Sequence, residues 1–409
     1  MTATTSLPPK GRPSGRVLVV PSSAGALLTA APAILMAFAA AAALAGVAVT
    51  GAAAAVPLGD PGGVVRWGLP VVSSLTRLAA ALTTGALLLV VAVLPRHAAT
   101  APRPARATGA TRSTGVSGAW PAAITLVALS AAAWTVLAVA ELVLTYGSVA
   151  GRPPTSARFG DELWLFATQV GIGRADAGIV VVVAVLTACA LVVRTPTGAA
   201  WTSGLAIAAL WLEAGTGHAA GAANHGLAVG SLFVHLVGAA VWVGGLGGLA
   251  VLHRRLGDDL RLAVRRYSTI AAWCLVAVGT SGMVNGAIRV GGLGGLASRY
   301  GALLLTKAAL LAVLGILGAG HRRVTIPHIG QGRTWPFWRL VLVELAVMGA
   351  VSGVAVALAA SAPPVVETTP VDPTPAYLLT GHPLPPALTG AAWFTQWRVD
   401  PVTLFAALA

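Results

Sequence analysis

The stretch EAGTGHAAGAANHGLAVGSLFVHLVGAAVWVGGLGGLAVLH, residues 213–253, decides the fold class and contains the candidate site. It begins with Glu213 near the end of one apolar segment and passes His218 and His225 in a short Gly/Ala turn. It then enters a second apolar segment, which carries His235 inside it. An ionisable side chain within a membrane span needs a partner, a ligand or water, so this histidine is a functional candidate. The structural alternative is a core histidine that is hydrogen-bonded to a neighbouring helix.

The rest of the chain has the composition of a membrane protein. Of its 409 residues, 56% are hydrophobic and 9% are charged, and the mean hydropathy is +0.83. Because a helix that crosses a bilayer needs about 20 mostly apolar residues, the sequence predicts an all-α, polytopic transmembrane helix bundle. Nine full spans are predicted, at 30–56, 69–94, 119–147, 177–193, 199–217, 227–252, 267–288, 300–319 and 338–361. The segment that begins at Pro401 predicts the start of a tenth.

Composition also divides the chain into regions. The predicted regions are a disordered basic cytoplasmic tail over 1–29, four transmembrane helices with an outer interfacial helix over 30–200, a transmembrane core of helices five to nine over 201–361, an extracytoplasmic linker over 362–400 and a short final segment over 401–409. The interfacial helix is predicted within 155–176, where apolar residues recur at helical spacing.

The net charge of +14 indicates membrane topology and no nucleic-acid partner. Most lysines and arginines fall in segments that alternate onto one side of the predicted bundle, whereas the other side is nearly balanced in charge. This is the positive-inside bias, so we expect a multi-pass protein of the plasma membrane with a cytoplasmic N-terminus. Its basic inner segments would meet anionic membrane lipid.

Charged residues inside the predicted spans indicate ion pairs. Arg77 and Glu141 lie at nearly the same depth below the outer ends of their helices, so we predict that they pair. Glu213, His235 and Lys307 share this depth.

The inner side of the predicted bundle has its own polar residues. Glu344 lies near the inner surface and needs a partner there, such as a basic residue or a helix end. His253, His321 and His328 fall in segments rich in arginine, and we interpret them as solvated loop residues.

Small residues follow His235 along its helix. Trp242 falls on the same face, and Gly238 and Gly245 repeat at that spacing. The pattern fits either a groove beneath the histidine or a packing surface for a neighbouring helix.

Motifs spread over helices five to nine carry a family resemblance. They are FVHLVGAAVWVGGLGGL, RRYSTIA, SGMVNGAIRV, YGALLLTKAAL, RLVLVELAV and LAASAPP, within about 204–364. Together they resemble the CopD copper-resistance family of bacterial membrane proteins, and the upstream TGHAA is similar to a histidine motif of such proteins. After the ninth helix, TPAYLLTGHPLPPALTG and FTQWRVDPVTLFA resemble the start of a CtaG-type cytochrome c oxidase assembly factor. Actinobacterial-type proteins join these two domains, so 401–409 would begin a truncated second domain.

The resemblance implies that copper ion is handled across the membrane, and the residues then have to supply its ligands. Imidazole binds both Cu(I) and Cu(II), and the chain has only four Met and two Cys. We therefore predict metal contacts from His218 and His235, with His225 and Glu213 as additional ligands or as groups that orient a ligand. About 12 Å along the helix separates His235 from the outer mouth. Both a single converging site and a relay of two sites remain open, and convergence is slightly favoured.

The expected function is non-enzymatic copper transport, as uptake or delivery linked to copper homeostasis and cytochrome oxidase maturation. An extracytoplasmic copper chaperone or cytochrome c oxidase would then be a partner. Two alternatives remain: a membrane haem protein with histidine axial ligands, and an oxidase assembly scaffold that binds no metal.

Overall fold

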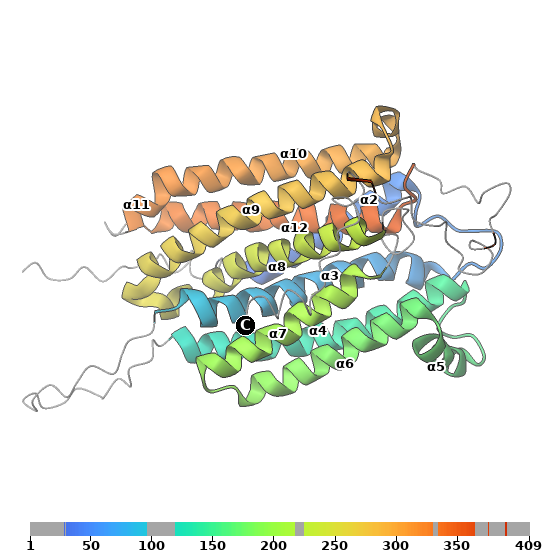
Figure 1. Ribbon diagram of the computed structural model, residues 1–409, viewed down its shortest axis with the longest axis horizontal. Coiled ribbons are helices and arrows are strands. Elements are labelled where there is room, and N and C mark those ends of the chain that lie inside the picture. Colours follow the sequence, from blue (N-terminus) through green and yellow to red (C-terminus); the bar gives the residue numbers. More distant parts are fainter. Residues whose placement is uncertain are drawn as a thin grey trace, which may run out of the picture.

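The long helices of the computed structural model run side by side along one axis (Figure 1). The structure describes residues 28, 30–95, 119–216, 225–329 and 334–364, together with 375, 389 and 390, and no strand occurs among them. The long helices are α2 (Ala31–Thr50), α3 (Gly63–Leu88), α4 (Ala119–Ala150), α6 (Gly171–Val192), α7 (Pro196–Ala214), α8 (His225–Leu256), α9 (Leu260–Val290), α10 (Arg299–Gly320) and α12 (Trp335–Ala360). The shorter elements are α5 (Phe159–Gln169), α11 (Ile326–Ile329), π-helical turns at Leu89–Val93 and His321–Thr325, and 3-10 turns at Gly257–Asp259 and Leu293–Ala297.

Eight helices among the described residues are long and apolar enough to cross a membrane. The fold is therefore the predicted all-α, multi-pass membrane bundle. Of the nine predicted spans, α7 is the one outside this set, although it has 19 residues. It packs against α3, α6 and α8 as part of the bundle, and its crossing of the membrane stays a prediction. Residues 1–27 of the tail predicted over 1–29, most of the linker and the tenth segment lie outside the described residues.

The helix α5 lies at one end of the bundle, as expected for the short helix within 155–176 (Figure 1). Phe166 is buried against Tyr146 of α4, whereas Trp164 and Leu165 are exposed. This arrangement fixes α5 to the bundle through one face and leaves an apolar face open. We refer below to this end as the α5 end and to the opposite end as the α11 end.

Several helices continue past the apolar stretches that predicted them. The helices α8 and α9 are separated only by the 3-10 turn, and α10 runs through a π-helical turn into α11. His253 and His321 are consequently buried, with 8% and 6% of their surface exposed. The interpretation of these two histidines as solvated was wrong, because Trp338 and Phe337 of α12 pack against their rings.

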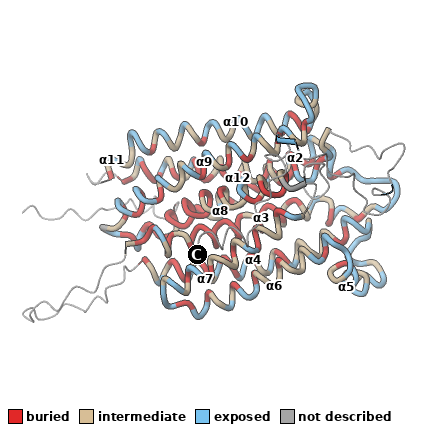
Figure 2. The backbone as a smooth tube through the Cα atoms, viewed as in Figure 1, coloured by how far each residue is buried: buried red, intermediate tan, exposed pale blue. Residues whose placement is uncertain are grey.

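The side of α8 that faces α3 is packed through glycine. A Cβ atom at Gly244 would lie 1.6 Å from the carbonyl oxygen of Ala81, and one at Gly85 would lie 2.1 Å from the Gly244 backbone. The two backbones are therefore in direct contact, which only residues without a side chain allow. Buried residues follow α3 and α8 through the middle of the bundle (Figure 2).

A second side of α8 packs against α9. Gly238 faces Val278, and Gly245 lies against the ring of Tyr267, which would be 2.4 Å from an added Cβ atom. The small residues that follow His235 thus form a packing surface for α9, which was one of the two predicted interpretations. Trp242 is buried on this side and accepts a hydrogen bond from the Tyr267 hydroxyl through its carbonyl oxygen.

Candidate functional site

Arg77 stands at the centre of an ionic cluster that ties α3, α4 and α7 together. Its Nη1 atom lies 2.7 Å from Oε1 of Glu213 and 3.5 Å from Oε1 of Glu141. Ser73 donates a hydrogen bond of 2.6 Å to the same oxygen of Glu141. The predicted Arg77–Glu141 pair is confirmed, and Glu213 joins it as the closer partner. We call these four residues the Arg77 cluster; it sets one guanidinium against two carboxylates.

His235 lies on the other side of α8, between α9 and α10. Its Nδ1 atom is 3.1 Å from the carbonyl oxygen of Val278 and 3.1 Å from Oγ of Ser281. Its Nε2 atom is 3.3 Å from Nζ of Lys307. We call His235, Val278, Ser281 and Lys307 the His235 site.

The partners of His235 determine its tautomer. A carbonyl oxygen can only accept a hydrogen bond, so Nδ1 carries the proton that Val278 accepts. The lone pair of the neutral imidazole is then on Nε2, where the ammonium group of Lys307 donates to it. The ring nitrogen that a metal ion would bind is therefore oriented by α9 and faces a cation from α10.

Polar side chains continue from His235 toward the α5 end. Asn285 of α9 donates a hydrogen bond of 2.7 Å to Oγ of Ser231, one turn before His235 on α8. It also donates to the carbonyl oxygen of Ser281. The interface between α8 and α9 thus carries a polar strip that leads from Ser231 and Asn285 to His235.

Of the predicted ligands, the structure describes the side chains of Glu213 and His235, and these two side chains have different partners. Glu213 belongs to the Arg77 cluster, and His235 has its own partners on the other side of α8. His225 begins α8, but its side chain lies outside the described residues, and so does all of His218. Within the described part of the chain, no three His, Cys, Asp or Glu side chains gather to hold a metal ion. A shared site of His218 and His235 stays a prediction.

A further ionisable pair lies toward the α11 end, and the sequence interpretation missed one of its members. Nε2 of His321 is 3.1 Å from Oε2 of Glu344. The expectation that Glu344 has a basic partner on this side is thereby confirmed. That requirement was the available signal for a basic residue on this side, where His321 follows the predicted eighth helix over 300–319.

These features define a multi-helix membrane protein with ionisable groups held inside its spans. Residues 261–358 match the model of the family described as Copper resistance protein D. The matched segment supplies every partner of His235 and both members of the His321–Glu344 pair.

Two relatives are similar to parts of this chain. The chain is 33% identical over 150 residues to the "Copper transport protein CutJ" of Bacillus subtilis (strain 168), a match that covers 34% of this chain and 28% of that protein. It is 26% identical over 272 residues to the "Inner membrane protein YebZ" of Escherichia coli (strain K12), which covers 60% of this chain and 91% of that protein. No solved structure gives a significant match.

Proposed function

We propose that this protein carries copper across the plasma membrane and that His235 contacts the ion on its way. The match to the copper-resistance family model and the likeness to a copper transport protein support the class of function. The observation that carries the role of His235 is its geometry. Its imidazole lies inside an apolar span. Nδ1 bonds to Val278 and Ser281 and carries the proton, so Nε2 has the lone pair that can bind a metal ion.

Lys307 controls cation access to His235 in this proposal. Two unit charges that meet near a protein interior repel by several kcal/mol at an effective dielectric constant of about 20. Copper can bind Nε2 only when the ammonium group moves away or becomes neutral. Lys307 therefore keeps the site closed until an ion displaces it.

The polar strip between α8 and α9 is the proposed route to this site. His225, at the start of α8, is about 15 Å from His235 along the helix axis. That separation favours a relay, in which His218 and His225 form an entry site and His235 receives the ion. Glu213 is held by Arg77, and its cluster, with two carboxylates against one guanidinium, would attract a cation at this level without ligating it.

The distribution of arginine supports the proposed orientation. Basic residues gather at the α11 end, where they include Arg194, Arg254, Arg255, Arg261, Arg265, Arg266, Arg322, Arg323 and Arg339. By the positive-inside bias, this distribution supports an α11 end in the cytoplasm and an α5 end outside. A link to oxidase maturation, through cytochrome c oxidase or a copper chaperone as partner, comes from the sequence resemblance after residue 364 and remains part of the proposal.

The described histidines favour copper over haem. Axial ligation of haem iron by two histidines needs two imidazoles that face each other across the macrocycle. His235 faces Lys307 and His321 faces Glu344, so each of these two imidazoles already meets a partner from another helix.

Cellular copper content tests the proposal. A strain that lacks the gene should differ from its parent in copper per cell, and the wild-type gene should restore the parental value. The His235→Ala variant should fail to restore it at equal membrane abundance. His328→Ala is the matched control, because His328 lies on the short helix α11, away from the His235 site. Full restoration by His235→Ala would refute the role of His235.

A further inference from the structure

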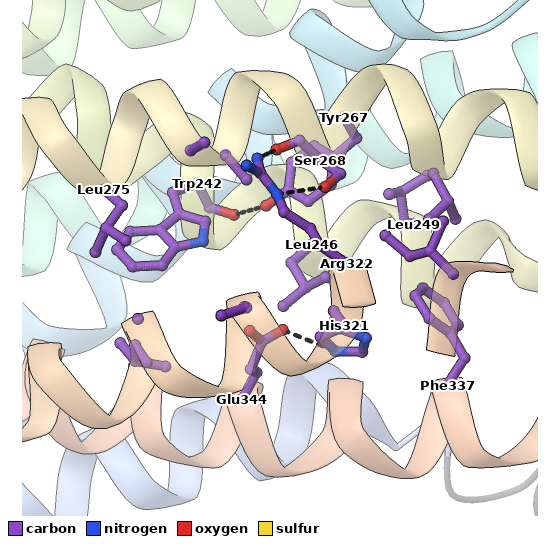
Figure 3. Close-up of a pocket in the computed structure, with 18 of the residues that line it drawn as sticks. Trp242, Leu246, Leu249, Tyr267, Ser268, Leu275, His321, Arg322, Phe337 and Glu344 are labelled. Atoms are coloured by element: carbon purple, nitrogen blue, oxygen red, sulfur yellow. Dashed lines mark hydrogen bonds and ion pairs between the residues drawn. The ribbon is translucent and has the colours of Figure 1, made fainter. Parts of the chain in front are cut away.

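The His321–Glu344 pair is buried and borders a cavity (Figure 3). Glu344 has 4% of its surface exposed and His321 has 6%. His321 is the first residue of the π-helical turn that follows α10. Such turns shift the rotation of the side chains that follow and occur often at functional sites. Here the π-helical turn begins at His321, whose ring lies close to Glu344 of α12.

The hydrogen bonds of His321 engage Nδ1 and leave Nε2 facing the carboxylate of Glu344. Its Nδ1 atom lies 2.8 Å from Oγ1 of Thr325, and the Thr325 hydroxyl group is within reach of the His321 carbonyl oxygen. The Thr325 hydroxyl can donate either to the His321 carbonyl or to Nδ1. In the first case Nδ1 carries the proton and the lone pair of the imidazole is on Nε2; in the second case Nε2 carries the proton toward Glu344. Nε2 makes no hydrogen bond within the described residues, although it is close to Glu344.

A lone pair and a carboxylate oxygen at 3.1 Å repel each other unless a positive charge lies between or beside them. In an apolar interior this cost is not screened by water. The pair is therefore stable only with a proton or another cation. It has the donor types, imidazole nitrogen and carboxylate oxygen, that bind borderline transition metals.

The cavity beside the pair has a volume of 320 Å³. It is large enough for a hydrated ion, since one water takes about 30 Å³ of liquid volume. The neighbouring polar groups are engaged: the Tyr267 hydroxyl donates to the Trp242 carbonyl, and Arg322 donates to the hydroxyl and carbonyl oxygens of Ser268. Figure 3 shows Arg322 reaching across to Ser268 and away from Glu344.

We propose that Nε2 of His321 and the carboxylate of Glu344 form a second cation site, with water from the cavity completing the coordination of a transition-metal ion. The inference rests on the proposed function and names copper as that ion. Lys307 and His321 lie on one continuous helical run, about 20 Å apart along its axis. The pair would thus receive copper after the His235 site, on the cytoplasmic side.

The competing explanation is an ion pair that only stabilises the contact between α10 and α12. Removing one member of a buried pair destabilises a protein in either case, whereas replacing both by apolar residues is often neutral or stabilising. The double variant His321→Leu/Glu344→Leu therefore separates the two explanations, because it can fold without the pair.

The test is copper titration of the purified full chain in lipid nanodiscs, with Cu(II), the oxidation state that nitrogen and oxygen donors suit, supplied from a competing chelator. The double variant and Glu344→Gln should each bind one copper equivalent fewer than wild type, or bind it at least about tenfold more weakly, a loss of 1.4 kcal/mol. His253→Phe is the matched control, since His253 is also buried against α12 but does not line the cavity. It should keep the wild-type stoichiometry.

The outcomes distinguish this inference from the function on which it rests. If the double variant folds and keeps wild-type stoichiometry and affinity, the pair is structural and the inference fails, while loss of copper in His235→Ala would still support transport. If wild type binds no copper, both proposals fail. If the double variant does not fold, Glu344→Gln, which preserves shape, decides by the same measurement.

Discussion

The side of α8 that faces α3 differs from the side that faces α9 in how the helices approach each other. Toward α3, Gly244 lets the two backbones touch. Toward α9, side chains mediate the contact: His235 bonds to Val278, and the Tyr267 ring fills the space beside Gly245. Direct backbone contact fixes the position of one helix against the other. A contact made by side chains includes polar groups that can change their hydrogen-bond partners. The α9 side is thus the one suited to binding an ion.

Charge differs between the two sides as well. Arg77 is paired with Glu141 and Glu213, so its positive charge has carboxylate partners within the bundle. For Lys307, no ion pair occurs among the described residues, and its ammonium group faces the imidazole of His235. A structural ion cluster needs each buried charge to have a partner of opposite sign. A cation without an acidic partner beside Nε2 of His235 is what the proposed copper site would need to release its ion.

The largest effect on stability should come from the Arg77 cluster. Arg77→Met strands two carboxylates in low dielectric and should lower the free energy of unfolding by about 3–5 kcal/mol. Denaturant or thermal unfolding in detergent measures this loss. Adding Glu213→Leu to that variant should recover part of it, because one stranded charge is removed. A fully stable Arg77→Met variant would contradict the structural role of the cluster.

Backbone contact between α3 and α8 should give the next effect. Gly244→Ala places a methyl group against the Ala81 carbonyl and should cost about 1–3 kcal/mol, the usual range for overpacking. Gly204→Ala in α7 is the matched control, since an added Cβ atom there meets nothing within 4 Å. Unfolding of both variants under the same conditions tests this. Equal stabilities would mean that the two helices are not in such close contact.

A smaller effect is expected from the α9 side. Tyr267→Phe keeps the ring against Gly245 but removes the hydrogen bond to the Trp242 carbonyl. The expected loss is about 0.5–1.5 kcal/mol, the net value of one hydrogen bond. A loss as large as that of Gly244→Ala would show that the two sides of α8 contribute alike to stability and would contradict this difference between them.

The apolar stretches predicted most of the fold because a bilayer fixes the length of a spanning helix. Counting residues from helix ends also predicted the Arg77–Glu141 pair, since axial rise fixes depth. Depth does not fix rotation about the helix axis. The sequence therefore did not show that Glu213 turns toward Arg77, and its predicted place near His218 and His225 lies outside what the described residues test.

The inner histidines show a second limit of the sequence. His253 and His321 stand among arginines, so local composition indicated solvent. Burial comes from Trp338 and Phe337, which are distant in sequence and fold back over the two rings. Because Glu344 needed a partner, a basic residue was expected on the inner side of the bundle. Sequence position alone could not select His321 as that residue.

Copper affinity of Lys307→Met, measured beside wild type and His235→Ala in the same lipid, tests the central claim most directly. Removing the ammonium group should tighten copper binding by at least about tenfold, or 1.4 kcal/mol, because the cation no longer competes for Nε2. His235→Ala should weaken binding, and adding it to Lys307→Met should abolish the gain. Unchanged affinity in all three variants would show that copper does not bind at His235.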